Sequence, residues 1–202
     1  MSIQSFKTLS KKKKVLIFDL DDTLVHLNID WGEYIFELKN YFQDKAPKLI
    51  EGKYTFNELH TSESLIFDRY DNEAREELRK ITEPVEMAMD GYWANKELVN
   101  FINKAHKDFE ELYIWTSNHT KTAETVLSDI GILDIFKKVV SKDSITWMKP
   151  SPEGFNKIIY NPNKFSKSDY LFAGNSTFSD KGAAENADID FFVLFHGISG
   201  HC

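Results

Sequence analysis

Residues 15–24 read VLIFDLDDTL, so four apolar residues lead directly into a cluster of aspartates. A short uninterrupted apolar run is typical of a strand that is buried on both faces of a parallel sheet. Because residues i and i+2 of a strand face the same side, we expect Asp19 and Asp21 to project together while Leu20 points into the core. Two carboxylates at one strand end repel each other unless a metal ion neutralises them or one of them holds a proton. Either condition suits catalysis, with one carboxylate as nucleophile and the other as general acid and base.

The remainder of the chain alternates between short apolar runs and helical patterns. Between two of these runs, Thr120 is expected to cap a helix that Gly131 ends. Alternation of this kind predicts an α/β fold with a Rossmann-like open parallel sheet and helices on both of its faces. The runs that predict the further strands are LYIW (112–115), KVV (138–140), YLFAG (170–174) and FFVLF (191–195).

Residues 26–90 interrupt this alternation, because they contain no strand-like run. Apolar residues recur at helical spacing over 31–42 and again over 74–85, which predicts helices in both stretches. Trp31 and Tyr34, at the start of this segment, either face a substrate or pack in its core.

The interruption divides the chain into two predicted parts. We expect a helical cap insert at 26–91 and a Rossmann-like catalytic core formed by residues 1–25 and 92–202. In open α/β sheets, ligands bind outside the carboxyl ends of the strands. An insert that follows the first strand directly would therefore cover the site as a lid.

Length and charge limit the class of protein. The 202 residues allow one large domain or a core with a smaller insert, and the net charge of −7 argues against broad nucleic-acid binding. Cys202 is the only cysteine, so an internal disulfide is impossible. The apolar run after the lysines at 11–14 is too short for a signal sequence or a membrane span. We expect a cytoplasmic protein without nucleic-acid or membrane partners.

Polar residues follow the second and third predicted strands. Thr116, Ser117 and Asn118 precede a helix, where a hydroxyl and free backbone N–H groups form a cradle for an anion. Lys149 lies between a loop and a helix start, where its ammonium could meet a phosphate oxygen as a point charge. Taken singly, Thr116, Ser117 and Asn118 would be explained by an ordinary helix cap, and Lys149 by one surface lysine among many.

The fourth predicted strand ends in GNSTFSD, which contains Asn175 and Asp180. Both side chains offer oxygen ligands of the kind that Mg²⁺ prefers, although a polar turn would look the same in isolation. The residues at the four strand ends are more informative together than singly, because each end supplies a part of one site that the others lack.

In this order, FDLDDTL, YIWTSN, the lysine of MKP, and GNSTFSD resemble the four motifs of the haloacid dehalogenase (HAD) superfamily of aspartate-nucleophile phosphohydrolases. The connecting segments SDIGILDIFKKVVSKD and KPSPEGFNKII also resemble the sequence around the third motif of this superfamily. The resemblance spans residues 14–195, and the insert resembles the helical cap of the phosphoglycolate-phosphatase-like branch.

The resemblance implies a reaction and the residues that carry it. Asp19 would attack phosphorus and form an aspartyl-phosphate, while Asp21 would protonate the leaving oxygen and then deprotonate the hydrolytic water. Two further sets of residues are implied. The phosphate-binding set comprises Thr116, Ser117, Asn118 and Lys149. The Mg²⁺ set comprises Asp19, the carbonyl of Asp21, Asn175 and, directly or through water, Asp180.

One residue departs from the family pattern. The fourth motif usually has an aspartate after its glycine, where this chain has Asn175. An amide oxygen can still coordinate Mg²⁺, but one negative charge is lost, so weaker binding is expected.

The resemblance therefore predicts a Mg²⁺-dependent phosphatase that acts on a small phosphorylated metabolite as a monomer or weak homodimer. Two alternatives stay open. One is a phosphoryl-transferring mutase of the same superfamily. The other is a binding or regulatory protein that keeps the fold with a weakened site, which only Asn175 encourages.

Overall fold

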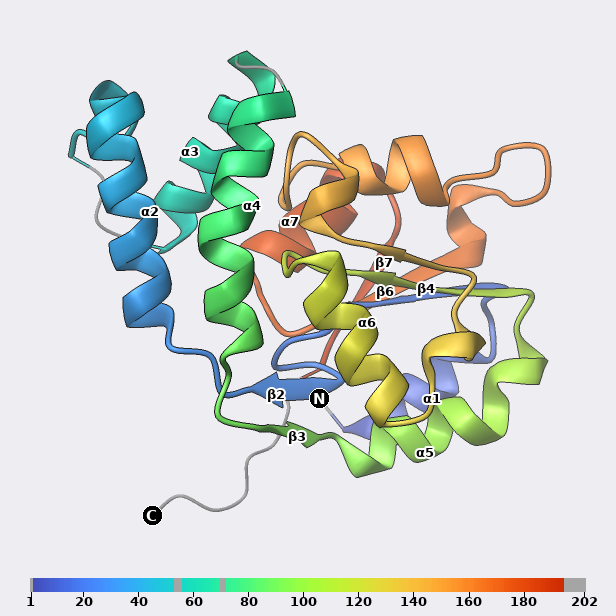
Figure 1. Cartoon of the computed structure of the whole chain (residues 1–202). Helices are drawn as coiled ribbons and strands as arrows, with labels where there is room; N and C mark the ends of the chain where they lie inside the picture. Colours follow the sequence, from blue (N-terminus) through green and yellow to red (C-terminus); the bar gives the residue numbers. More distant parts are fainter. Residues whose placement is uncertain (1, 53–55, 70–71, 195–202) are drawn as a thin grey trace.

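The computed structural model describes residues 2–52, 56–69 and 72–194 (Figure 1). Its centre is a five-stranded sheet of order β5-β4-β1-β6-β7, in which every pairing is parallel. The strands are β1 (Val15–Phe18), β4 (Glu111–Trp115), β5 (Lys138–Val140), β6 (Tyr170–Gly174) and β7 (Asp190–Val193). The predicted Rossmann-like parallel sheet is confirmed, and residue 195 of the last predicted run lies outside the described residues.

Strand β1 occupies the middle of this sheet. After β1 the chain adds β4 and β5 on one side, and it then crosses back to add β6 and β7 on the other. The strand order therefore reverses at β1, and such a switch point is where open α/β sheets bind ligands. Asp19 follows β1 at this point.

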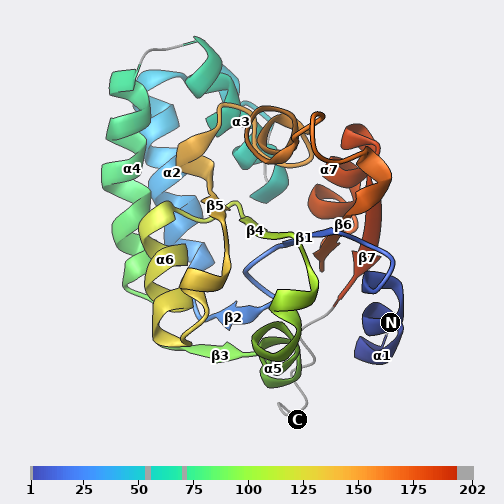
Figure 2. The same ribbon diagram turned by 90° about the vertical axis from the view of Figure 1, so that its right-hand side faces the viewer.

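Successive residues of β1 pack on opposite faces of the sheet. Leu16 and Phe18 join an apolar cluster with α1 (Ile3–Ser10), α5 (Lys96–Ala105) and α6 (Thr120–Asp129). Val15 and Ile17 join a second cluster with the π-helical segment Phe155–Ile159 and α7 (Ser179–Ala187). Figure 2 shows α5 and α6 on one side of the strands and α7 on the other. Short 3₁₀ turns lie at Pro47–Leu49, His106–Asp108, Leu133–Ile135, Lys142–Ser144 and Lys167–Asp169.

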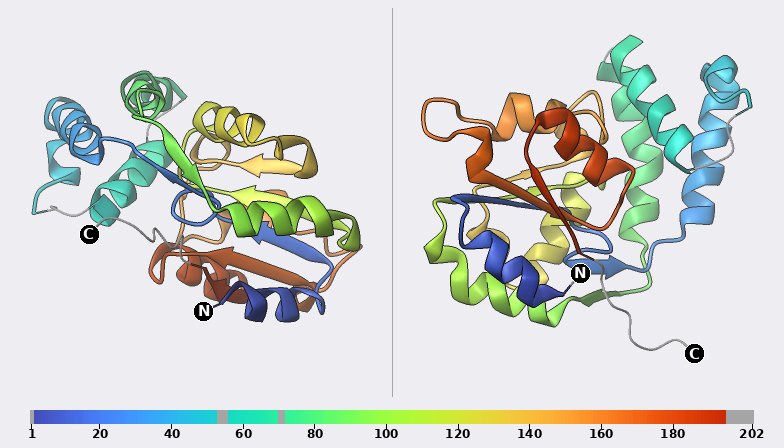
Figure 3. Two further views of the ribbon diagram at one scale, coloured as in Figure 1. Left: turned by 90° about the horizontal axis from the view of Figure 1, so that it is seen from below. Right: turned by 180° about the vertical axis from the view of Figure 1, so that it is seen from behind.

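Three α-helices of the described chain lie between β2 (Val25–Leu27) and β3 (Tyr92–Ala94), and they stand to one side of the five-stranded sheet (Figure 3). They are α2 (Trp31–Lys45), α3 (Phe56–Arg69) and α4 (Asn72–Met87), and they share an apolar core that includes Tyr34, Leu38, Phe42, Leu59 and Leu78. The apolar spacing at 31–42 and 74–85 thus gave the correct secondary structure. The division of the chain at 25/26 and 91/92 stays a prediction.

An antiparallel pair of strands, β2 (Val25–Leu27) and β3 (Tyr92–Ala94), joins the two ends of this helical segment and was not predicted from the sequence. Three residues are too few to show the alternation by which a strand is recognised.

A buried ion cluster connects the three helices to the sheet. The ammonium of Lys142, in the turn after β5, lies 3.4 Å from Glu63 Oε1 on α3 and 3.9 Å from Glu86 Oε1 on α4. It also donates a hydrogen bond to the hydroxyl of Tyr34 on α2. None of these side chains is more than 1% exposed, so Lys142 offsets two carboxylates that water does not reach.

His119 forms a second connection, between α4 and the start of α6. Its backbone N–H donates to Glu86 Oε2 (2.9 Å), and its ring lies between Asp143 Oδ1 (2.8 Å to Nδ1) and Thr82 Oγ1 (2.7 Å to Nε2). The Thr82 hydroxyl also donates to the carbonyl of Leu78. His119 thus connects α4 with the turn after β5 through its two ring nitrogens.

Replacing Lys142 with methionine is expected to lower the free energy of unfolding by about 3–5 kcal/mol, because the buried carboxylates of Glu63 and Glu86 would lose the ammonium that lies between them. Urea denaturation at pH 7 measures the change. Lys167→Met is the matched control, since Lys167 lies 3.9 Å from the 89% exposed Asp188. We expect a loss below about 1 kcal/mol there. Equal losses in the two variants would contradict a structural role for the buried cluster.

Candidate active site

A cavity of about 420 Å³ opens at the carboxyl ends of β1, β4 and β6. Every site residue predicted from the sequence lines it: Asp19, Asp21, Thr116, Ser117, Asn118, Lys149, Asn175 and Asp180. The structure thus brings together residues that are up to 161 positions apart in the chain. Their roles remain predictions.

Asp19 is fixed at the end of β1. Its backbone N–H donates to the carbonyl of Ala173 on β6 (2.9 Å), and its side chain is almost entirely buried. The strand ends at Phe18, so Asp19 and Asp21 lie in the following loop and not on the strand as expected. Leu20 is fully buried, as predicted, and both aspartates face the cavity because the loop turns at Asp22, where φ is 57°.

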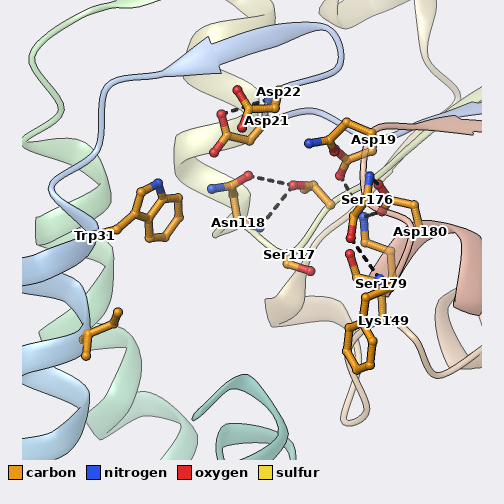
Figure 4. Close-up of a pocket in the computed structure, with 14 residues that line it drawn as sticks. Asp19, Asp21, Asp22, Trp31, Ser117, Asn118, Lys149, Ser176, Ser179 and Asp180 are labelled. Carbon is orange, nitrogen blue, oxygen red and sulfur yellow. Dashed lines mark hydrogen bonds and ion pairs between the residues drawn. The ribbon is translucent and has the colours of Figure 1, made fainter. Parts of the chain in front are cut away.

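Lys149 is the central cation of the site (Figure 4). Its ammonium donates to Asp19 Oδ1 (2.7 Å), Asp180 Oδ1 (2.6 Å) and the carbonyl of Trp115 (2.9 Å). These contacts use all three of its donors. The other oxygen of Asp180 accepts from the N–H of Ser176 (3.0 Å).

A glycine allows Asp180 to reach this position. A Cβ atom on Gly174, the last residue of β6, would lie 2.5 Å from Asp180 Oδ2. Glycine is therefore required at residue 174 for the carboxylate to approach Lys149.

The two aspartates after β1 have raised pKa values. Burial, together with the negative charge of Asp180, raises the pKa of Asp19 to about 7, although Lys149 opposes the shift. Burial raises the pKa of Asp21 to about 8, against the effect of hydrogen bonds from the N–H groups of Leu27 (2.8 Å) and Asp22 (3.1 Å). At neutral pH, and without a metal, Asp21 therefore carries the proton that one of two close carboxylates was expected to hold.

The loop after β4 is a smaller anion cradle than the sequence predicted. Its helix, α6, begins at Thr120, whose N–H donates to Asp143 Oδ2 (2.7 Å), so a carboxylate from another loop caps the helix in place of the Thr120 side chain. The preceding N–H, that of His119, donates to Glu86. Both amides are thus already satisfied. Within the described residues, the Ser117 N–H and hydroxyl have no such acceptor and face the cavity.

Thr116 and Asn118 are bound to each other. The Thr116 hydroxyl donates to Asn118 Oδ1 (2.8 Å) and accepts from the Asn118 N–H (3.1 Å). These bonds hold the loop in a tight turn, and an incoming phosphoryl group would compete for the same hydroxyl.

Oxygen donors suited to Mg²⁺ converge beside Asp19. The hydroxyl of Thr23 lies 3.2 Å from Asp19 Oδ2 and 3.5 Å from Asn175 Oδ1, so these two oxygens face one point. Carboxylate, carbonyl and amide oxygens are the ligands of this hard cation, and a positive charge would relieve the repulsion that raises the pKa of Asp19. The residues present therefore fit a magnesium ion.

A second group of potential ligands lies nearby. In the described part of the chain, Asp21, Asp22 and His26 form the one group of three acidic, histidine or cysteine side chains whose ligand atoms all lie close enough to share an ion. Asp22 and His26 are already hydrogen-bonded to each other (2.6 Å).

Several residues of the cavity wall were not predicted. The cavity is also lined by Ile35 from α2, by Ser179 at the start of α7, and by Asp22, Ser176 and Phe178 from the loops after β1 and β6. Phe178 is 53% exposed, and a large aromatic residue within the polar turn GNSTFSD was a signal that could have identified it. Of the two residues considered at the start of the insert, Trp31 lines the cavity, whereas Tyr34 is buried beside Lys142.

The family model of the haloacid dehalogenase-like hydrolases matches residues 16–194. The chain belongs to this family. The resemblance of the four motifs to the HAD superfamily is thereby confirmed, as is the prediction of a HAD-type hydrolase.

Solved structures of HAD proteins share the fold. A candidate HAD-like hydrolase from Bacteroides fragilis has a TM-score of 0.62 at 20% identity, covering 93% of this chain and 90% of the other. A magnesium-bound candidate HAD hydrolase from Bacillus subtilis has a TM-score of 0.55 at 21% identity, with coverages of 94% and 90%. A protein from Haemophilus somnus described as a predicted phosphoglycolate phosphatase has a TM-score of 0.58 at 18% identity, with coverages of 92% and 87%. No curated protein sequence gives a match.

Among the described helices, none is both long enough and apolar enough to cross a membrane.

Asp21→Asn is expected to stabilise the metal-free HAD protein increasingly as pH rises. The pKa of Asp21 is about 8 in the folded chain and near 3.8 when exposed, so the wild type loses stability as pH rises from about 4 to about 8, whereas an amide does not titrate. We expect a gain on the order of 1–3 kcal/mol at pH 8.

Urea denaturation with a chelator present, at several pH values, measures this difference. Asp188→Asn, at an exposed helix end with φ 59°, is the control and should give no trend with pH. A pH-independent effect of Asp21→Asn would show that its carboxyl is not desolvated.

Proposed function

We propose that the chain is a Mg²⁺-dependent phosphatase that hydrolyses a small soluble phosphomonoester through an aspartyl-phosphate. The observation that carries this proposal is the placement of Asp19, paired with Lys149, and Asp21, with its raised pKa, on the wall of one cavity. The pair supplies a buried nucleophile beside a carboxyl group that holds a proton, which are the two groups that covalent phosphate-ester hydrolysis requires.

In the first step, an oxygen of Asp19 attacks phosphorus in line with the ester bond. The P–O bond to the leaving alcohol breaks, and Asp21 transfers its proton to that oxygen. In the second step, the Asp21 carboxylate takes a proton from water as the water oxygen attacks phosphorus. The bond between phosphorus and Asp19 breaks, so inorganic phosphate leaves and both aspartates return to their starting states.

Other residues hold the phosphoryl group and the metal. Lys149, the Thr116 hydroxyl, and the Ser117 and Asn118 loop would donate to the phosphoryl oxygens. Asp19, the Asp21 carbonyl and Asn175 would hold Mg²⁺, which neutralises phosphoryl charge. Both Asp180 oxygens already accept hydrogen bonds, which favours contact through water over direct coordination.

The remaining predictions follow from this function. We propose that residues 26–91 act as the cap and that 1–25 with 92–202 form the catalytic core. A cytoplasmic location and a monomer or weak homodimer stay predictions. Several proteins of similar fold are described as phosphoglycolate phosphatases, which supports phosphomonoester chemistry without identifying the substrate of this chain.

Asp19→Asn is expected to lower phosphate release by about 10³-fold or more, because an amide is not a nucleophile for phosphorus. Release is measured from a panel of phosphomonoesters with and without Mg²⁺, with Asp188→Asn as a surface control. Wild-type activity that survives a chelator, or that persists in Asp19→Asn, would contradict the mechanism. Phosphate that appears on an added alcohol, with little free phosphate, would instead identify the mutase alternative.

Asn175→Asp is expected to lower the Mg²⁺ concentration for half-maximal activity by about tenfold, because it restores one negative charge to the proposed ligand set. A Mg²⁺ titration of phosphate release measures this value. Asn163→Asp adds the same charge at an exposed position and should leave it unchanged. An unchanged value in Asn175→Asp would show that the side chain does not contact the ion.

A further inference from the structure

Three apolar side chains line the cavity around the catalytic groups. Trp31 projects from α2 on the opposite side of the cavity from Asp19 and Lys149 (Figure 4). Ile35 lies one helical turn further along α2, and Phe178 comes from the loop after β6. A phosphoryl group bound at Asp19 would direct its organic part toward these side chains.

The exposure of Phe178 at the cavity indicates a side chain that contacts a ligand and is not part of the packed core. Its side chain is 53% exposed although it belongs to a loop that otherwise forms hydrogen bonds at the site. Exposed aromatic side chains alone are not unusual here, since Phe36 is 57% and Trp93 is 50% exposed. Those two do not line the cavity, whereas Phe178 does. An aromatic ring that lines a cavity loses contact with water when an apolar ligand binds.

The charges of the residues that line the cavity also favour a ligand whose organic part is uncharged. Of the described residues that line it, Asp19, Asp21, Asp22 and Asp180 are acidic, and Lys149 is the one cation. Lys149 is already shared between Asp19 and Asp180. Lys142, in the turn after β5, does not line the cavity and is buried against Glu63 and Glu86.

A second anionic group on a ligand would therefore be placed among carboxylates. Even with Mg²⁺ bound, the negative charge of the phosphoryl group would offset the positive charge that the site provides. A carboxylate on the leaving group would be desolvated without a described cation to pair with it.

We infer that this site selects phosphomonoesters whose organic part is uncharged and aromatic, bound against Trp31, Ile35 and Phe178. It disfavours carboxylated esters such as phosphoglycolate, the compound in the names of several similar folds. The inference rests on the proposed function for its phosphoryl subsite, and it adds the chemical class of the substrate.

Three primary alkyl phosphates test this selectivity with similar leaving groups: benzyl phosphate, ethyl phosphate and phosphoglycolate. With the wild-type chain and excess Mg²⁺, we expect kcat/KM for benzyl phosphate to exceed that for phosphoglycolate by at least about tenfold, which corresponds to about 1.4 kcal/mol. Ethyl phosphate should fall between them, because it lacks both the ring and the carboxylate. A preference for phosphoglycolate over benzyl phosphate would overturn the inference.

Variants test whether the apolar side chains of the cavity cause the preference for benzyl phosphate. Phe178→Ala should lower the benzyl-to-ethyl ratio of kcat/KM by about fivefold or more, mainly through KM, and its exposure means that little packing is lost. Trp31→Ala should act in the same direction. Phe36→Ala, on the same helix but outside the cavity, should leave the ratio unchanged. Phe178→Lys supplies a cation and should raise the phosphoglycolate-to-ethyl ratio. Equal losses for benzyl and ethyl phosphate in Phe178→Ala and Trp31→Ala would overturn the assignment.

Binding without turnover separates this inference from the proposed function. Calorimetry with Mg²⁺ compares benzylphosphonate and phosphonoacetate, which carry the same two organic groups on a bond that cannot be hydrolysed. Tighter binding of benzylphosphonate with no hydrolysis of any ester would support the inference while the proposed function fails. Hydrolysis with tighter binding of phosphonoacetate would overturn the inference while the function stands. Neither binding nor hydrolysis of any compound would overturn both.

Discussion

The bridge from Lys149 to Asp19 and Asp180 is the interaction on which the site depends. Lys149 comes from the loop after β5, Asp19 follows β1, Asp180 lies at the start of α7, and the Trp115 carbonyl ends β4. One buried ammonium therefore joins segments from across the sheet at their carboxyl ends. Its position also explains why residue 174 is glycine, since a side chain there would displace Asp180.

The single positive charge of Lys149 does not neutralise all the acidic side chains of the site. Asp21 and Asp22 lie beside it, and burial shifts the pKa of Asp21 to about 8 and that of Asp19 to about 7. A fold optimised for stability alone would not bury such a cluster, because each desolvated carboxylate opposes folding. Excess negative charge at a buried strand end is the kind of cost that functional sites retain, here in a form that a divalent cation relieves.

The helices of the insert complete the cavity from the other side. Lys142, in the turn after β5, forms buried ion pairs with α3 and α4 and donates a hydrogen bond to Tyr34 on α2. His119 is hydrogen-bonded to α4, and Arg75 adds a hydrogen bond to the carbonyl of Ile145 (2.7 Å). These contacts hold the three helices against the loops that follow β4 and β5, and α2 carries Trp31 and Ile35 at the cavity. The proposed reactive groups lie at the strand ends, whereas the apolar side chains of the cavity come from both α2 and the loop after β6, so membership of the HAD family does not by itself define the substrate.

The sequence alone determined the sheet, the family and the residues at the strand ends. Short apolar runs mark strands buried on both faces, and polar residues directly after them meet at one edge in any parallel sheet, so local patterns were sufficient for Asp19, Thr116, Lys149 and Asp180. Only the tertiary structure decided which donors are already engaged. The N–H groups of His119 and Thr120 are satisfied by Glu86 and Asp143, at sequence separations of 33 and 23 residues. It also decided that Lys142 is buried against Glu63 and Glu86. Such pairings depend on contacts between distant segments, and no periodicity or local motif encodes them.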